Sequence, residues 1–345
     1  MSNYLEEPDQ QSVRKKRRPV RIVLFSALAL VLVAGIVAGG YLFNLANTYN
    51  TQTETIAEVF PESTYRPTRA PAAEEARNIL LLGSDENGGS GETEDLPGVP
   101  NAGRSDTMML MHIPANREGV YVMSIMRDTW TEIPGYGEHK INAATAFGGV
   151  PLLVETLEGM FDAPIDHVAI IDFEGFTGLT DALGGVTVTN EIAFQSRGAD
   201  GEFFEQGEIN LQGESALKFV RERYAFTDGD FQRVKNQQLF IKAVMGKFLT
   251  AETLTNPLKV NEVVNQVSPY LSVDEGLDAS TAGGLALSLR SIRSDDVQFF
   301  TLPNLGIGTS ADGQSIILKD DAAIAEIAEA LDTDTLGDYV QAAAQ

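Results

Sequence analysis

The segment NILLLG at 78–83 decides the fold. Its four consecutive apolar side chains, bounded by Asn78 and Gly83, are typical of a strand that is buried on both faces. Two similar runs follow, TMMLMHI at 107–113 and VYVMSIM at 120–126, and the short connection between them predicts an antiparallel pair. We expect further strands at 165–173, 186–190 and 297–302.

Helical patterns occupy most of the intervals between these strands. We expect helices at 150–162, 174–183, 211–220, 231–249 and 276–293. Apolar strands interleaved with helices need cover on both faces of their sheet. The sequence therefore predicts an α/β fold, specifically a three-layer α/β/α domain with a mixed central sheet.

An uncharged stretch, IVLFSALALVLVAGIVAGGYLF at 22–43, precedes this domain. As a helix it would extend about 33 Å, enough to span the hydrocarbon core of a bilayer. A cleavable signal peptide is the alternative, but its apolar region would be shorter and would end in small residues. This stretch ends in Tyr41, Leu42 and Phe43, so we predict one uncleaved transmembrane helix.

The flanking segments give the orientation of this helix. Residues 1–21 hold six basic and three acidic side chains, which predicts a cytoplasmic tail by the positive-inside rule. Residues 44–76 contain three prolines and show neither a helical stripe nor strand alternation, so we expect an extracytoplasmic stalk. The folded domain is expected over 77–345. These features predict a single-pass protein of the cell membrane whose C-terminal domain lies outside.

The composition excludes several classes of function. The chain has 25 Lys and Arg against 49 Asp and Glu, a net charge of −24, and the segment from residue 44 onward carries −27. A domain this acidic is repelled by nucleic acid, so we expect no nucleic-acid partner. The absence of cysteine excludes disulfides, thiol nucleophiles and Cys-ligated metals.

Charged residues follow the ends of the apolar strands. Asp85 comes directly after the first strand, where open α/β sheets place ligand groups, although a surface aspartate is equally common there. Arg104 and Asp106 are two residues apart and share one side of an extended segment, where a surface ion pair is the alternative. Arg127 follows another apolar run. Charges at two strand ends suggest that they converge on one site.

Two helical segments add further candidates. In GESALKFVRER at 213–223, Arg221 and Arg223 would diverge on a continuing helix but would align if the chain straightened after Val220. On the helix at 231–249, Arg233 and Gln237 fall on the apolar stripe. Buried polar groups need partners, and an anionic ligand would supply them. A structural pair with Asp230 or with a backbone carbonyl is the alternative.

At these residues the sequence resembles the LytR-CpsA-Psr family of membrane-anchored cell-envelope phosphotransferases. The resemblance is carried by seven blocks in order, which cover about 78–250 closely. The blocks are LLLGSD (80–85), GRSDTMML (103–110), SIMRDT (124–129), KINAATAFGG (140–149), DFEGFTGLTDALGGV (172–186), GESALKFVRER (213–223) and DGDFQRVKNQQ (228–238).

The resemblance implies an enzyme that takes a glycan from a polyprenyl-pyrophosphate-linked donor and attaches it through a phosphodiester to a hydroxyl of peptidoglycan or another wall polymer. Polyprenyl phosphate would be released. The positions that match the pyrophosphate-binding residues of the family are Arg104, Arg127, Arg221, Arg223 and Gln237. Those that match its magnesium-associated acids are Asp85 and Asp106, so we expect a Mg²⁺ cofactor there.

Two other functions are compatible with parts of the sequence. A polyprenyl-pyrophosphate hydrolase would use the same site, with water in place of the acceptor hydroxyl. A transcriptional attenuator is disfavoured, because the acidic domain would lie across the membrane from DNA and a tail of about 20 residues cannot fold into a recognition module. We therefore predict a phosphotransferase in which the arginines clamp the diphosphate.

Overall fold

The computed structural model describes residues 39–62, 66–84, 105–198, 200–248 and 256–343. The chain forms two compact units, Met1–Leu45 and Ala46–Gln345, and a helix covers 39–52. The predicted cytoplasmic tail at 1–21 and most of the predicted transmembrane stretch at 22–43 lie outside the described residues. Within the described ranges, no helix combines the length and the apolar character that crossing a membrane requires.

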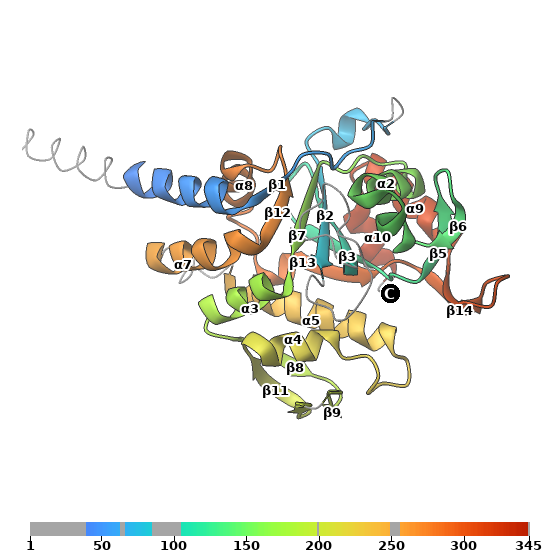
Figure 1. The fold of residues 1–345 in the computed structure, drawn as a ribbon. Coiled ribbons are helices and arrows are strands. Elements are labelled where there is room, and N and C mark those ends of the chain that lie inside the picture. The colour runs from blue at the N-terminus through green and yellow to red at the C-terminus, as the bar shows by residue number, and fades with distance from the viewer. Residues whose placement is uncertain (1–38, 63–65, 85–104, 199, 249–255, 344–345) are drawn as a thin grey trace, which may run out of the picture. The chain divides into compact units, whose positions relative to one another are not determined.

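A mixed seven-stranded sheet forms the centre of the larger unit, in the order β1-β12-β7-β2-β3-β4-β13 (Figure 1). The predicted antiparallel pair is confirmed, with Met108 of β3 opposite Ile125 of β4. Parallel pairs join β2 to β7, β4 to β13 and β1 to β12. The strands are β1 (Glu54–Ile56), β2 (Arg77–Ser84), β3 (Ser105–Ile113), β4 (Val120–Ile125), β7 (His167–Ile171), β12 (Leu271–Asp274) and β13 (Val297–Thr301).

Helices cover both faces of this sheet, because alternate residues of its strands are apolar on both sides. Leu80 and Leu82 of β2 share one buried cluster with residues of α2, α9 and α10, whereas Ile79 shares another with residues of α5 and α8 (Figure 1). The helices are α2 (Ala143–Phe161), α5 (Asp230–Phe248), α8 (Ala279–Ser288), α9 (Asp321–Asp332) and α10 (Leu336–Ala343).

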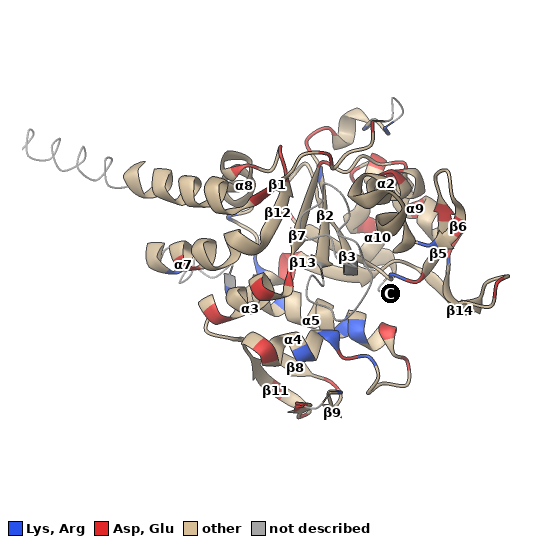
Figure 2. Ribbon diagram, viewed as in Figure 1, with Lys and Arg blue, Asp and Glu red and all other residues tan. Residues whose placement is uncertain are grey.

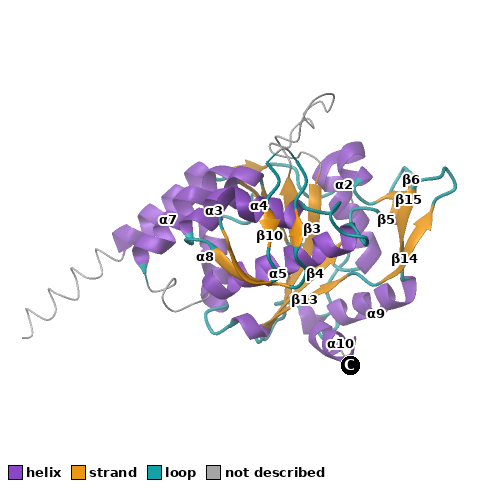
Figure 3. Cartoon of the chain, turned by 90° about the horizontal axis from the view of Figure 1, so that it is seen from below, coloured by secondary structure: helices purple, strands orange, loops and turns teal. Residues whose placement is uncertain are grey.

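A second, four-stranded sheet lies at one end of the domain, in the order β14-β15-β5-β6 (Figure 3). It was not predicted from the sequence. Strand β5 of this sheet begins two residues after Arg127, so Arg127 lies in the short connection between the central sheet and the second sheet. The strands are β5 (Thr129–Ile133), β6 (Gly137–Lys140), β14 (Asn304–Thr309) and β15 (Ser315–Lys319).

A third apolar cluster is built by the segments between β7 and β12. The predicted strand at 186–190 is present, but it pairs with β11 in a separate two-stranded sheet rather than in the central one. A second small sheet pairs β9 with β10. The elements are α3 (Phe173–Ala182), β8 (Val186–Asn190), β9 (Phe194–Gln195), β10 (Phe203–Phe204), β11 (Gly207–Leu211), α4 (Gly213–Arg221) and α7 (Pro257–Val267). Short 3-10 turns are η1 (Pro71–Ala73), η2 (Ser268–Tyr270) and η3 (Ser294–Asp296).

The segment expected to form a stalk, 44–76, differs from that expectation. It contributes β1 to the edge of the central sheet, and Ile56 and Val59 are buried in the cluster that contains α2. Arg66 also pairs with the buried carboxylate of Glu158 at 2.5 Å. Residues before Arg77 therefore belong to the folded domain. The sequence did not predict this, because a strand of only three residues is too short to be recognised from its periodicity.

Candidate active site

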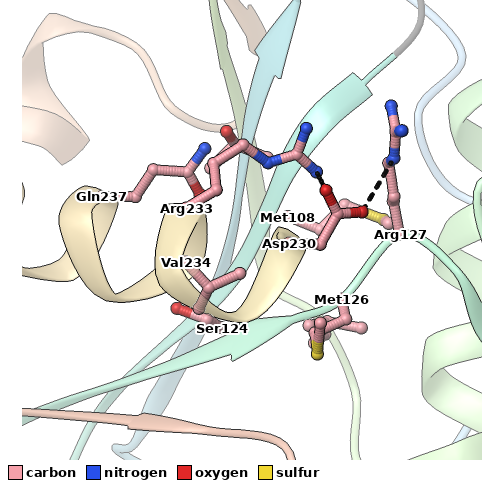
Figure 4. Close-up of a pocket in the computed structure, with 10 residues that line it drawn as sticks. Met108, Ser124, Met126, Arg127, Asp230, Arg233, Val234 and Gln237 are labelled. Atoms are coloured by element: carbon pink, nitrogen blue, oxygen red, sulfur yellow. Dashed lines mark ion pairs between the residues drawn. The ribbon is translucent and has the colours of Figure 1, made fainter. Parts of the chain in front are cut away.

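The carboxylate of Asp230 lies among three arginine side chains. Its Oδ2 is 3.6 Å from Nε of Arg127, and its Oδ1 is 3.4 Å from Nη2 of Arg233 (Figure 4). The same Oδ1 is 3.5 Å from Nη1 of Arg223. Arg127 follows the end of β4, Arg223 lies in the loop after α4, and Arg233 lies in the first turn of α5. Figure 2 shows Lys and Arg gathered at the adjoining ends of α4 and α5.

Local sequence places Asp230 where it can act as this hub. Gly229 has a φ of +51°, a conformation that glycine adopts without a Cβ penalty, and it turns the chain into α5. Asp230 then opens the helix, where a negative side chain is favoured by the helix dipole. Arg233 follows three residues later on the same helical face, so the helix itself brings the two charges together.

Arg233 and Gln237 are buried, as their place on the apolar stripe predicts, with exposed fractions of 4% and 7%. The side-chain amide of Gln237 donates to the carbonyl of Val220 at 3.3 Å. Both residues therefore have protein partners of the kind left open as the alternative to a ligand, namely Asp230 and a backbone carbonyl. Both also line one pocket together with Arg127, Asp230 and residues of β3 and β4 (Figure 4).

Buried Glu222 shapes the chain between α4 and α5. Its Oε1 accepts hydrogen bonds from the backbone N–H groups of Arg223, Tyr224 and Ala225 at 2.9, 2.7 and 3.0 Å. Its Oε2 accepts another from Arg197 at 2.5 Å. These bonds stabilise the turn that follows the extended conformation of Glu222. Sequence reasoning missed this residue, since an acid between two arginines looks like a surface charge.

The chain straightens after α4, as predicted, but Arg221 and Arg223 have different surroundings. The guanidinium of Arg221 stacks over the Phe173 ring at 4.1 Å, and Arg221 is exposed. Arg223 pairs with Asp230 and hydrogen-bonds the Tyr224 hydroxyl. Partial burial alone would lower the pKa of Arg223, but the Tyr224 hydroxyl and the Asp230 carboxylate outweigh it, so the pKa is raised. Arg223 therefore remains a cation.

A second ion pair adjoins the first. Nζ of Lys140, at the end of β6, lies 3.2 Å from Oδ1 of Asp128, whose Oδ2 is 4.0 Å from Nε of Arg127. The backbone N–H of Asn142 donates to the Arg127 carbonyl at 3.2 Å. The segment that ends β6 is thus fixed beside the arginine cluster.

The remaining predicted site residues lie where less is described. Asp85 and Arg104 lie outside the described residues, and of Asp106 only the backbone is described. Asp106 is the extra residue of a β-bulge, because Gly83 pairs with Thr107 while Ser84 pairs with Ser105.

A magnesium site is not formed by the described side chains. Among them, no group of three or more His, Asp or Glu is arranged to hold a metal ion. Asp230, the carboxylate within the pocket, is engaged by arginines instead. The predicted ligands Asp85 and Asp106 are hard oxygen donors of the type that Mg²⁺ prefers.

The charges of the cluster match a diphosphate diester. Three guanidiniums and one carboxylate leave two positive charges, within a chain whose net charge is −24. Guanidinium forks pair with phosphate oxygens through two parallel hydrogen bonds, and they remain charged at all physiological pH values. The arrangement can therefore receive a ligand with two phosphate charges.

Comparison with known proteins shows what the chain as a whole is similar to. The chain is 38% identical over 209 residues to the polyisoprenyl-teichoic acid–peptidoglycan teichoic acid transferase TagU of Halalkalibacterium halodurans, a match that covers 60% of this chain and 64% of that protein. It is 28% identical over 319 residues to TagU of Bacillus licheniformis, which covers 91% of this chain and 96% of that protein.

Solved structures agree on the fold. The crystal structure of TagV from B. subtilis superposes with a TM-score of 0.64 at 22% identity, over 76% of this chain and 98% of that one. Residues 40–333, most of the chain, match the LytR_cpsA_psr family. The chain therefore belongs to the LytR-CpsA-Psr family.

Proposed function

We propose that this protein transfers a polyprenyl-pyrophosphate-linked glycan of the teichoic acid class to a hydroxyl of peptidoglycan. The observation that carries the proposal is the convergence of Arg127, Arg223 and Arg233 on Asp230. Family membership and the names of the relatives support the same reaction.

In the proposed reaction, the acceptor hydroxyl oxygen attacks the phosphorus that carries the glycan. A new phosphorus–oxygen bond forms, and the bond from that phosphorus to the bridging oxygen breaks. The bridging oxygen leaves with the lipid as polyprenyl phosphate. The arginines stabilise the charge that accumulates on the phosphate oxygens, which is the main contribution a protein makes to phosphoryl transfer.

Asp230 holds the arginines ready for this ligand. Three guanidiniums so close together would repel one another, and the carboxylate offsets that repulsion. When the diphosphate binds, its oxygens compete with Asp230 for the same hydrogen-bond donors. Arg221 and Arg104 are proposed to extend the clamp, with Gln237 beside it.

Asp85 and Asp106 are the proposed magnesium ligands. A bound Mg²⁺ would neutralise charge on the diphosphate oxygens. This proposal is supported by their match to the magnesium-associated acids of the family and by their carboxylate oxygens, which suit Mg²⁺. Acceptance of the proton from the acceptor hydroxyl is the second role open to these carboxylates.

The proposed location is the outer face of the cell membrane. The stretch at 22–43 would anchor the chain, and the basic residues of 1–21 would keep its N-terminus in the cytoplasm. This orientation brings the domain to the side where peptidoglycan is found and keeps it beside a lipid-linked donor.

The test uses the full-length chain in lipid nanodiscs with Mg²⁺, a lipid-linked teichoic acid precursor and purified peptidoglycan. We expect a covalent glycan–peptidoglycan product and release of polyprenyl phosphate, both dependent on the acceptor. Release of two monophosphates at the same rate without acceptor would identify a hydrolase and contradict the proposal.

A further inference from the structure

Three aromatic side chains form a cluster on the second sheet and the start of α2. The rings of Tyr136 and Phe147 stack at 4.5 Å with an interplanar angle of 13°, and His139 meets Phe147 edge-on at 5.0 Å. Tyr136 and Phe147 are 51% and 38% exposed. One face of the Tyr136 ring is covered by Phe147, so its exposed area lies on the other face and the edges. We call these three residues the aromatic platform.

The platform is held by its own hydrogen bond and by a break in α2. Gly149 has a φ of +70°, and the helix is kinked at Gly148 and Gly149, directly after Phe147. The Tyr136 hydroxyl donates to the Phe147 carbonyl at 3.3 Å. The turn before β6 is therefore tied to the residue that precedes the kink.

The start of α2 connects the platform to the arginine cluster. The backbone N–H of Asn142, which precedes this helix, is hydrogen-bonded to the Arg127 carbonyl. Phe147 follows Asn142 by five residues of helix, a rise of about 7.5 Å. The platform therefore lies a short distance along α2 from the residue that holds the Arg127 backbone.

We propose that the aromatic platform binds a pyranose ring of the peptidoglycan glycan strand and so positions the acceptor. This inference rests on the function proposed above. Flat aromatic faces fit the C–H faces of sugar rings, and aromatic side chains provide large contact areas at little conformational cost.

The test compares the full-length Tyr136→Ala/Phe147→Ala variant with the wild-type chain in nanodiscs. We expect the KM for soluble peptidoglycan glycan chains to rise about 10-fold or more, with kcat at saturating acceptor and the KM for the lipid-linked donor unchanged. Phe203→Ala removes an aromatic residue of similar exposure, 54%, on β10 and serves as the matched control. Tyr136→Phe keeps the ring and should keep a KM close to that of the wild type.

The outcomes separate the two proposals. An unchanged acceptor KM in a folded, active double variant would overturn the role of the platform and leave the transferase proposal intact. If the double variant raised the KM for the donor and not the KM for the acceptor, the platform would bind the donor glycan. That result would also overturn the proposed role in acceptor binding. If the wild-type chain transfers nothing, co-sedimentation with purified peptidoglycan still tests the platform: loss of binding in the variant, but not in Phe203→Ala, supports it. Equal binding to peptidoglycan by the wild-type chain and the double variant would contradict it.

Discussion

Oδ2 of Asp230 lies 3.6 Å from Nε of Arg127, and this ion pair links the end of β4 to the first turn of α5. The same carboxylate serves Arg223 and Arg233. An acidic residue therefore occupies the position around which guanidiniums would gather to bind phosphate. In the proposed function, Asp230 keeps the arginines together without substrate and competes with substrate for them.

Replacement of Asp230 tests this dual role. In Asp230→Asn the guanidiniums lose their counter-charge, so we expect a loss of about 2–3 kcal/mol in the free energy of unfolding and a Tm lower by roughly 5–10 °C. Pyrophosphate should raise the Tm of this variant more than that of the wild type, because no carboxylate competes. Differential scanning fluorimetry at matched ionic strength measures both effects.

Asp228→Asn is the matched control, since Asp228 is exposed in the same turn. Its Tm and its response to pyrophosphate should equal those of the wild type. If Asp230→Asn responded to pyrophosphate less than the wild type does, competition between Asp230 and phosphate would be disproved.

Arg221 is a separate case, because its guanidinium packs on the Phe173 ring. An exposed cation–π contact contributes only about 0.5–1 kcal/mol, so Arg221→Ala should lower the Tm by a few degrees at most. We expect transfer to fall at least about 100-fold if the side chain reaches the diphosphate.

Asp106→Ala should also abolish transfer, with a Tm close to the wild-type value. Retained turnover in either variant would contradict the clamp in its proposed form.

Glu222 has a structural role that leads to a third prediction. Glu222→Ala would leave four backbone N–H groups without their acceptor, at a cost of at least about 3 kcal/mol. The Tm should fall by about 6–12 °C, and activity should fall because Arg223 loses its fixed position. Exposed Glu214→Ala, on the first turn of α4, should have little effect on either. A Glu222→Ala variant as stable as wild type would show that the N–H groups find other acceptors.

Asp172, which caps α3 by accepting from the Gly175 N–H at 2.7 Å, should make stability depend on pH. Burial raises the pKa of this carboxyl above its usual value. The folded chain therefore binds the proton more tightly than the unfolded chain does, so the contribution of Asp172 to stability increases as the pH falls through the raised pKa.

Asp172→Asn keeps a capping oxygen and removes the charge. The stability difference between this variant and the wild type should shift in favour of the wild type as the pH is lowered from 7 to about 4, as urea unfolding at each pH will measure. Asp172→Ala, which lacks the cap, should lose about 1 kcal/mol. A difference between Asn and wild type that did not change with pH would contradict the raised pKa.

Much of the central sheet could be predicted because its strands are apolar on both faces. The runs that became β2, β3, β4, β7 and β13 are of this kind. By contrast, β5 and β6 read TWTEI and GEHK, in which apolar and polar residues mix without a long run, and β5 also pairs with β15, which is far away in the chain. The pairing of β5 with β15 depends on cross-strand contacts that no local window contains.

The site was predictable to the extent that each arginine occupied an unusual place. Arg127 follows an apolar strand, and Arg233 lies on an apolar helix stripe. The contribution of Glu222 could not be foreseen, because its four hydrogen bonds go to backbone groups, which have no sequence signature. The sequence indicated Asp230 only as a possible structural partner of Arg233 and Gln237, and not as a carboxylate shared by three arginines.

The edge strand β1 determines which recombinant fragment is suitable for crystallography. A polypeptide starting at Arg77 would lack the three residues that pair with β12, would remove Ile56 and Val59 from the interior, and would leave Glu158 without Arg66. The bared backbone of β12 would then be open to intermolecular pairing. Expression from Ala46 keeps the whole second unit, and it should yield monodisperse material where the shorter fragment aggregates.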